Sequence, residues 1–320
     1  MKLSLVVPCY NEEDTIEKFY EAVKGAFINH IKEYELIFVN DGSRDQTLHK
    51  LHQIYNKKEK NIKVVSFSRN FGKEAAMFAG LKQAIGEYVT IIDADLQQRP
   101  EVVVKMVEIL DEKPEIDCVA AYQEERKEGK VLSFFKNSFY KLINKMAEVD
   151  FVSGASDFRT FRQPVNQAIQ NMTEYNRFSK GIFSWVGFEV FYMPYEVQER
   201  EGGTSKWSFV KLFHYALDGI MAFTTAPLKI AVSLGGILSF GSVVYFIVYL
   251  LDYLLNRHEM SQMELIIGII LLLCGLQLLV LGIIGEYLAK LYIEGKNRPI
   301  YIAKEILSYS DENEEKKDDQ

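Results

Sequence analysis

The first part of the chain alternates short apolar runs with stretches in which apolar residues recur every three or four positions. The short runs predict strands, and the amphipathic stretches predict helices. A strand followed by a helix, repeated, is typical of a mostly parallel α/β sheet that helices cover on both faces. The predicted strands are Leu3–Pro8, Glu35–Asn40, Lys63–Phe67, Tyr88–Ile92 and Cys118–Ala121, and the predicted helices lie near Thr15–Phe27, Asp45–Asn56, Lys73–Ile85 and Glu101–Asp111.

The C-terminal third contains two much longer apolar runs, Ile230–Leu255 and Glu264–Leu288. Each is about 25 residues long, and a helix needs roughly 20 residues to cross the hydrocarbon of a bilayer. The pattern therefore predicts two membrane-spanning helices, with a buried hairpin of core helices as the alternative. Basic residues flank the pair on the outside, which by the positive-inside rule predicts that both termini lie in the cytosol. These residues are Lys206, Lys211 and Lys229 before the first run, and Lys290, Lys296, Arg298 and Lys304 after the second.

An amphipathic stretch precedes the first apolar run and ends near Pro227. It predicts a helix on the membrane surface, with a core helix of the soluble domain as the alternative. A second amphipathic stretch, 131–146, fits either place equally well. The predicted organisation is a cytosolic catalytic domain over 1–205, a surface helix over 206–228, a transmembrane hairpin over 229–289 and a cytosolic tail over 290–320 whose end is disordered.

Charge and cysteine usage narrow the class of protein. The formal net charge of the 320 residues is −7, and the acidic end "SYSDENEEKKDDQ" accounts for part of it. An acidic chain is a poor general partner for nucleic acid. The three cysteines are far apart and predict neither a zinc site nor disulfides. The apolar run at the N-terminus is too short for a signal peptide, so the N-terminal part is expected in the cytosol.

Polar turns follow four of the predicted strands: "PCYNEE", "NDGSRD", "SRNFGK" and "DADLQQ". Because ligands of open α/β sheets bind at the carboxyl ends of the strands, these turns predict one shared site. The chain has no G-x-G-x-x-G after the first strand and no G-x-x-x-x-G-K-[ST]. A dinucleotide cofactor and hydrolysis of a nucleoside triphosphate are therefore not expected.

Asp93 and Asp95 stand on either side of one residue at the end of a predicted strand. Two carboxylates on one side of an extended segment repel each other, and a divalent cation would remove the conflict. Mg²⁺ or Mn²⁺ prefers such oxygen ligands and often binds together with substrate phosphates. Gln97 offers another oxygen. The alternative is that one aspartate only caps the following helix.

Six motifs occur in a fixed order: "VVPCYNEE", "VNDGSRDQT", "SRNFGKEAA", "DADLQQRPE", "GASDFRTF" and "EREGGTSKW". With the two predicted spans after them, they resemble the family 2 glycosyltransferases that act on polyprenyl phosphates, of the bactoprenol-phosphate glucosyltransferase and dolichol-phosphate mannose synthase type. The resemblance covers nearly the whole chain except the acidic tail. It implies a glycosyltransferase-A (GT-A) fold and inverting transfer of a hexose, glucose or N-acetylglucosamine, from a UDP-sugar to undecaprenyl phosphate at the cytosolic membrane face. It also implies Mg²⁺ or Mn²⁺ as cofactor and a homotetramer.

The resemblance also implies roles for individual residues. For the nucleotide-sugar these are Pro8, Tyr10, Glu12, Val39, Asp41, Lys73, Asp93, Ala94 and Asp95. The implied metal ligands are Asp95 and Gln97, and the implied catalytic residues are Asp157, Asp93 and Asp95. Asp157 matches the residue proposed as a base, although a lipid phosphate is already ionised near pH 7 and hardly needs one. An orienting or electrostatic role for Asp157 is therefore equally open.

Three basic residues, Arg126, Arg200 and Lys206, are expected to hold the acceptor phosphate or the diphosphate. The sequence departs from the family pattern here, because Gln123 stands where a first arginine would be expected. For Arg200 and Lys206, binding to anionic lipid is the alternative. A polysaccharide synthase that extends a sugar hydroxyl, or a non-catalytic module that binds a nucleotide-sugar, are the competing functions.

Overall fold

The computed structural model describes residues 1–57, 59, 61–123, 155–195 and 262–308, with isolated positions between 228 and 251. Contacts divide the chain into two units. One unit holds the whole sheet and its flanking helices, and the other holds the long helix α10 (Gln262–Glu294). The expected surface helix at 206–228 and the second amphipathic stretch at 131–146 lie outside the described residues, as does most of the first apolar run.

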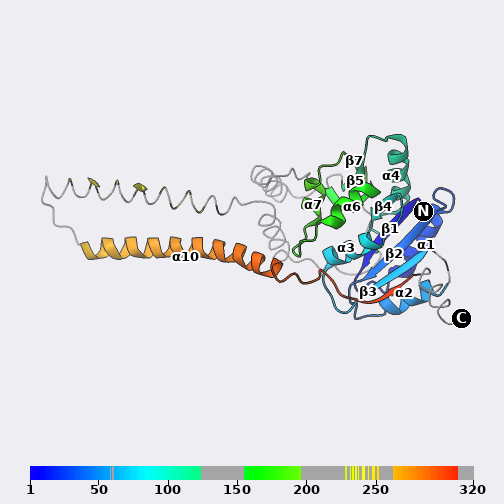
Figure 1. Cartoon of the computed structure of the whole chain (residues 1–320), viewed down its shortest axis with the longest axis horizontal. Coiled ribbons are helices and arrows are strands. Elements are labelled where there is room, and N and C mark those ends of the chain that lie inside the picture. The colour runs from blue at the N-terminus through cyan, green and yellow to red at the C-terminus, as the bar shows by residue number, and fades with distance from the viewer. Residues whose placement is uncertain are drawn as a thin grey trace. The chain divides into compact units, whose positions relative to one another are not determined.

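The first unit is built on one 8-stranded sheet with the order β7-β5-β6-β4-β1-β2-β3-β8 (Figure 1). All five strands expected from the sequence are confirmed, with ends that differ by one or two residues. They are β1 (Leu3–Cys9), β2 (Tyr34–Asn40), β3 (Ile62–Phe67), β4 (Tyr88–Ile91) and β5 (Cys118–Gln123). Three further strands, β6 (Ala155–Arg162), β7 (Val190–Tyr195) and β8 (Ala303–Leu307), were not anticipated.

Strands β4, β1, β2 and β3 run parallel, as the alternation of strands and helices predicts. The strand direction changes at β6, which lies between β4 and β5 and runs antiparallel to both. β8 pairs antiparallel with β3 and covers the opposite edge. β8 lies in the stretch that the sequence assigned to a tail, and it is held there by Tyr301, which stacks on Phe67 at 4.9 Å, and by a 3.1 Å contact between His52 and Glu305.

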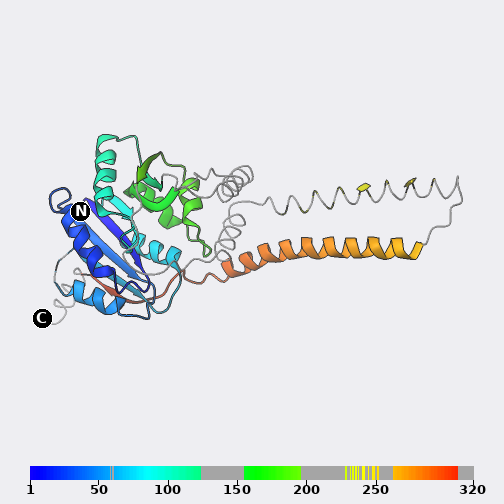
Figure 2. The same cartoon turned by 180° about the vertical axis from the view of Figure 1, so that it is seen from behind.

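Helices cover both faces of this sheet (Figures 1 and 2). One layer packs α1 against α2 and α4, and the other contains α3, α6 and α7. The four expected helices are confirmed as α1 (Ile16–Phe27), α2 (Thr47–Tyr55), α3 (Lys73–Gln83) and α4 (Pro100–Glu112). Two more, α6 (Gln163–Asn171) and α7 (Ser179–Trp185), follow the unanticipated strand β6.

The core follows the period of two along each strand. Leu3, Leu5 and Val7 are fully buried in the cluster beneath α1, α2 and α4. Val6 points to the opposite face, where α3 packs so closely that a Cβ added at Gly80 would lie 2.3 Å from Val6 Cγ1. The glycine therefore sets how near α3, and the residues at its N-terminus, approach the sheet.

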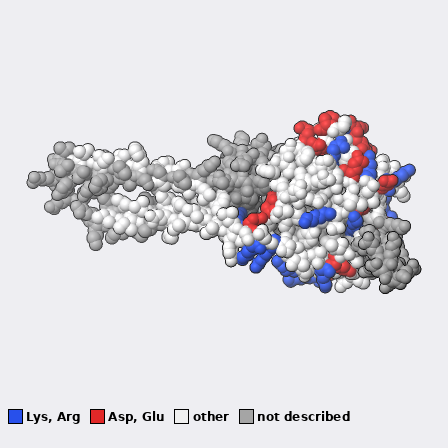
Figure 3. All heavy atoms as spheres, in the orientation of Figure 1, with Lys and Arg blue, Asp and Glu red and all other residues white. Residues whose placement is uncertain are grey.

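The second unit contains the second predicted span. In the part of the chain that the structure describes, one helical segment is long and apolar enough to cross a membrane, Gly275–Glu294 within α10. None of its apolar window is buried, unlike a core helix of a soluble protein, and leucines such as Leu278 and Leu281 are more than half exposed. In Figure 3 the surface of this helix is white along most of its length, whereas charged residues colour the first unit.

Candidate active site

The polar turns at the carboxyl ends of β1 and β2 are joined by hydrogen bonds. Asn11, at a positive φ of 54°, donates its N–H to Ser43 Oγ at 3.0 Å and accepts the N–H of Arg44 on Oδ1 at 2.9 Å. The N–H of Glu12 donates to Thr47 Oγ1 at 2.8 Å. These hydrogen bonds therefore link the turns after β1 and β2 to each other.

Asp41 joins the turn after β2 to the turn after β3. Its carboxylate accepts the N–H of Phe71 at 2.6 Å and the N–H of Gly72 at 3.0 Å. Burial raises the pKa of Asp41, while these two donors act to lower it. Gly42 follows at a φ of 62°, and a Cβ there would lie 2.4 Å from the carbonyl carbon of Arg69. Asp41 thus fixes the loop that leads into α3.

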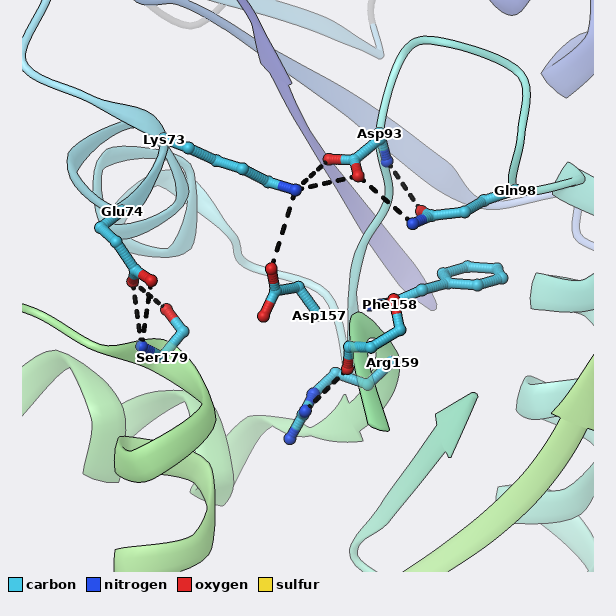
Figure 4. A network of polar contacts seen from close by, with 9 residues as sticks. Lys73, Glu74, Asp93, Gln98, Asp157, Phe158, Arg159 and Ser179 are labelled. Atoms are coloured by element: carbon cyan, nitrogen blue, oxygen red, sulfur yellow. Dashed lines mark hydrogen bonds and ion pairs between the residues drawn. The ribbon is translucent and has the colours of Figure 1, made fainter. Parts of the chain in front are cut away.

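Lys73, the first residue of α3, lies between two carboxylates at the centre of the site (Figure 4). Its Nζ is 2.6 Å from Asp93 Oδ1 and donates to Asp93 Oδ2 at 2.9 Å. The same Nζ is 3.7 Å from Asp157 Oδ2. The other oxygen of Asp157, Oδ1, is buried and makes no hydrogen bond with the described part of the chain.

The register of β4 and β6 explains why two aspartates from distant positions meet. Ile91 pairs with Arg159 in this antiparallel ladder. Continuing the ladder by two residues places Asp157 opposite Asp93, because antiparallel partners have a constant sum of residue numbers. The side chains of β6 alternate, so Asp157 and Arg159 share one face of the strand. The insertion of β6 beside β4 therefore brings Asp157 into the site.

The charges of this cluster stabilise one another. Burial would raise the pKa of Asp157, but the positive charges of Lys73, Lys180 and Arg159 more than offset it and hold this pKa below its usual value. Burial likewise opposes the charge on Lys73, yet the negative charges of Asp93 and Asp157 raise its pKa. At neutral pH the lysine is protonated and Asp157 is ionised.

Gln98 holds Asp93 from the other side. Its Oε1 accepts the N–H of Asp93 at 2.9 Å, and its Nε2 donates to Asp93 Oδ2 at 3.3 Å. With Lys73 on both oxygens, Asp93 already has its counter-charge within the protein. The repulsion between Asp93 and Asp95 that the sequence analysis expected a divalent cation to relieve is therefore already reduced at Asp93 by Lys73.

Asp95 and Gln97 form a turn of their own just beyond β4. The N–H of Gln97 donates to Asp95 Oδ1 at 3.1 Å, and Leu96 between them has a φ of 60°. Positive φ is unfavourable for a residue with a Cβ, and such conformations are concentrated at functional sites. Both side chains are partly exposed. The turn carries a carboxylate and a side-chain amide two residues apart in the sequence.

This pair of oxygen donors fits Mg²⁺ or Mn²⁺ only if other ligands complete the shell. Among the described residues, no group of three or more His, Cys, Asp or Glu side chains could hold a metal ion alone. Magnesium commonly binds through one or two carboxylates together with waters and substrate phosphates. Asp95 and Gln97 fit that mode, in which a diphosphate supplies further oxygens.

The remaining predicted site residues differ in their exposure. Val39 is fully buried and Ala94 is 2% exposed, so neither presents surface to a ligand in this conformation. Pro8, Tyr10 and Glu12 are partly exposed near the end of β1. The three predicted phosphate-binding residues, Arg126, Arg200 and Lys206, lie outside the described residues.

Four residues near the site were not singled out from the sequence: Glu74, Gln98, Arg159 and Ser179. The Ser179 N–H donates to both oxygens of Glu74, at 3.2 and 3.1 Å, and the Ser179 hydroxyl donates to Glu74 Oε2. Burial and the charge of Asp157 raise the pKa of Glu74 to about 7, whereas Ser179 and Arg177 act to lower it. Glu74, Gln98 and Arg159 occur inside recognised motifs, but Ser179 has no sequence signal.

Comparison with known proteins gives the family. The sequence matches the family described as "Glycosyl transferase family 2" over residues 4–170. An uncharacterized glycosyltransferase of Synechocystis sp. is 38% identical over 307 residues, covering 96% of this chain and 96% of that protein. The SfII prophage-derived bactoprenol glucosyl transferase of Shigella flexneri is 38% identical over 307 residues, covering 95% of this chain and 98% of that protein.

A solved structure of glucosyl-3-phosphoglycerate synthase from Mycobacterium tuberculosis, with Mn²⁺, UDP and phosphoglyceric acid, is more distant. It is 18% identical, covers 69% of this chain and 76% of that chain, and has a TM-score of 0.47. A likeness at this level adds nothing on ligands. The match over more than half of the sequence, and the relatives aligned along almost all of it, show that this chain belongs to glycosyl transferase family 2 and is a glycosyltransferase.

Proposed function

We propose that this glycosyltransferase moves a hexose, glucose or N-acetylglucosamine, from a UDP-sugar to undecaprenyl phosphate at the cytosolic face of a membrane. The observation that carries the proposal is the Lys73 ammonium held between Asp93 and Asp157 at the carboxyl ends of the strands. The lipid acceptor is supported by a nearly full-length relative that is named a bactoprenol glucosyl transferase. The UDP donor is supported by the family motifs.

The reaction proposed is a single displacement with inversion. An oxygen of the lipid phosphate forms a bond to C1 of the sugar while the bond from C1 to the β-phosphate oxygen breaks. Negative charge builds on the departing diphosphate, and positive charge builds near C1. Groups that are already oriented toward these charges stabilise the transition state without reorganising. Lys73 and Asp157 carry opposite charges a few ångströms apart and are suited to these two needs.

Asp157 is assigned an electrostatic and orienting role in this proposal. Its lowered pKa makes it a weak base, and general bases work best when their pKa lies near the working pH. The acceptor phosphate is also ionised at neutral pH. Asp157 is therefore better suited to hold Lys73 and to stabilise positive charge near C1 than to remove a proton.

Asp95 and Gln97 are the residues that would hold Mg²⁺ or Mn²⁺. When bound, the metal ion would neutralise charge on the diphosphate leaving group. Asp93 would not be a ligand, because Lys73 and Gln98 already engage its oxygens. The loop at Asp41 and the first turn, with Tyr10 and Glu12, would position the nucleotide.

The acceptor side is proposed from the sequence. Arg126, Arg200 and Lys206 would bind the lipid phosphate, and the segment 206–228 would lie on the membrane surface. Two spans within 229–289 would anchor the catalytic domain, 1–205, and keep both termini in the cytosol. The exposed apolar surface of α10 supports the second span. Assembly into a homotetramer stays a prediction that sedimentation of the solubilised protein would check.

The test is a transfer assay with the purified full chain in liposomes that contain undecaprenyl phosphate. Each UDP- or GDP-sugar of a panel is added with Mg²⁺ or Mn²⁺, and the lipid product is identified by mass spectrometry. We expect one UDP-hexose to give a lipid-linked monosaccharide. We expect Asp95→Asn to lose this product and chelation of the metal to have the same effect.

A matched control is Asp111→Asn. Asp111 pairs with Lys2 at 2.9 Å, at the beginning of β1 and so at the sheet edge opposite the proposed site. This variant should keep its activity. A polymer on the lipid would favour the polysaccharide synthase. Nucleotide binding without product from any donor would refute transfer to a lipid phosphate.

A further inference from the structure

Helix α7 is fastened to the beginning of α3 next to Lys73 (Figure 4). Ser179, the first residue of α7, donates both its backbone N–H and its hydroxyl to the carboxylate of Glu74. Glu74 follows Lys73 directly, so this contact fixes the helical turn that carries the central lysine.

A second contact lies one helical turn further along α3. The guanidinium of Arg177 stacks over the ring of Phe78 at 4.2 Å and donates to the carbonyl oxygen of Met172. Glu74 and Phe78 are four residues apart and therefore share one face of the helix. Arg177 and Ser179 engage this face at two points, and two points resist both sliding and rotation of α3.

Helix α7 is also fastened to β6. The guanidinium of Arg159 lies over the ring of Phe183 at 3.9 Å, and the rings of Phe161 and Phe183 meet edge to face at 5.2 Å. Asp157, Arg159 and Phe161 share one face of β6. The face of β6 that positions Asp157 is therefore the face on which α7 packs.

These contacts link α3, β6 and α7 in a closed cycle. Lys73 of α3 pairs with Asp157 of β6, and β6 contacts α7 through Phe183. Helix α7 in turn contacts α3 through the hydrogen bonds from Ser179 to Glu74, which is next to Lys73. We propose that α7 is a brace that sets the separation of Lys73 and Asp157, and that Glu74 and Ser179 are positioning residues for sugar transfer. This inference rests on the proposed function of Lys73 and Asp157.

The brace has a specific kinetic consequence. Glu74 and Ser179 are not among the residues assigned to the nucleotide, so losing their contact should leave binding of the donor largely intact. The transition state depends on the placement of charges, and a displacement of about 1 Å can cost roughly a hundredfold in rate. A defect of the brace should therefore lower kcat and leave KM for the donor nearly unchanged.

The experiment compares Glu74→Ala, Glu74→Gln and Ser179→Ala in the liposome assay, with thermal unfolding of each protein. We expect Glu74→Ala to lower kcat by about 10- to 100-fold at an almost constant KM. Glu74→Gln keeps an acceptor for Ser179 and should stay within about threefold of wild type. Ser179→Ala keeps the backbone donor and should lie between them. The double variant Glu74→Ala/Ser179→Ala should be no slower than Glu74→Ala, because the two residues act through one contact.

The matched control is Glu101→Ala, because Glu101 is also an acidic residue in the first turn of a helix but is exposed. It should keep the wild-type kcat. A wild-type kcat in Glu74→Ala, or a loss that Glu74→Gln does not rescue, would overturn the brace.

Amide hydrogen exchange separates failure of the brace from failure of the proposed function. If the wild-type protein transfers no sugar, the proposed function fails, and exchange alone decides on the brace. Faster exchange of residues 73–78 and 179–185 in Glu74→Ala, with residues 100–112 unchanged, supports it. Unchanged exchange in all three segments refutes it.

Discussion

Replacing Glu74 by glutamine should change how the stability of the protein depends on pH. Two features raise the pKa of Glu74 from 4.5 to about 7: its burial and the negative charge of Asp157 on β6. Ser179, at the beginning of α7, and Arg177 oppose the shift without cancelling it. Glutamine has nearly the same shape and can accept the bonds from Ser179, but it does not titrate.

The direction in which folding stability changes with pH follows from proton binding to Glu74. Between pH 4.5 and 7 the folded protein keeps a proton on Glu74 that the unfolded chain releases. Folding stability therefore falls as pH rises through this range and is level above it. One pKa unit corresponds to about 1.4 kcal/mol, which gives an upper limit of about 3 kcal/mol for the loss. Because Glu74 is partly exposed, we expect about 1–2 kcal/mol.

Thermal unfolding of the solubilised full chain from pH 4.5 to 8 measures this effect. The fluorescence of the two tryptophans reports unfolding. For a domain of this size, 1–2 kcal/mol corresponds to a shift of about 2–8 °C in apparent Tm. The apparent Tm of Glu74→Gln should match wild type near pH 4.5 and exceed it by this amount above pH 7.

Glu101→Gln is the control, because exposed Glu101 should leave the pH dependence as it is in wild type. Parallel curves for wild type and Glu74→Gln would refute the assignment of a raised pKa to Glu74. A Glu74→Gln curve that lies below wild type at pH 8 would show that the ionised carboxylate stabilises the fold, which contradicts the sign derived above.

Two further predictions follow from the site. Lys73→Met removes the charge that most strongly lowers the pKa of Asp157. The acid limb of the pH–kcat profile should therefore move to higher pH, and kcat should fall by about 100-fold or more. An unchanged acid limb would contradict the pairing of Lys73 with Asp157. Gly42→Ala places a Cβ 2.4 Å from the backbone of Arg69 at a φ of 62°. It should lower the free energy of unfolding, measured by denaturation, by about 2 kcal/mol or more. Gly25→Ala has open space around the new Cβ and should be neutral or stabilising in the same measurement.

Part of the site is local in sequence and could be predicted from it. Asp93, Asp95 and Gln97 lie within five residues at the end of one apolar run. Asp41 and Lys73 follow other predicted strands, and parallel strands bring their carboxyl ends to one edge. The sequence did not reveal what these residues contact. Asp41 holds backbone N–H groups of the next loop, and Lys73 pairs with Asp93.

The contacts of Glu74 and Ser179 show the limit of such reasoning. The two residues are separated by 105 positions, and a serine has no pattern that marks it as the partner of a distant glutamate. β8 is a similar case. It is only 5 residues long, and so short a segment carries too little periodicity to predict that it pairs with β3.

The sequence by itself determined the parallel α/β half, the turns that carry the site and the apolar run of α10, because periodicity and strand-end chemistry are local properties. Only the tertiary structure decided that β6 inserts antiparallel between β4 and β5 and that α7 joins it to α3. Those choices depend on pairing and packing between distant segments, which local patterns do not encode. They place Asp157 beside Lys73 and so complete the charged centre of the site.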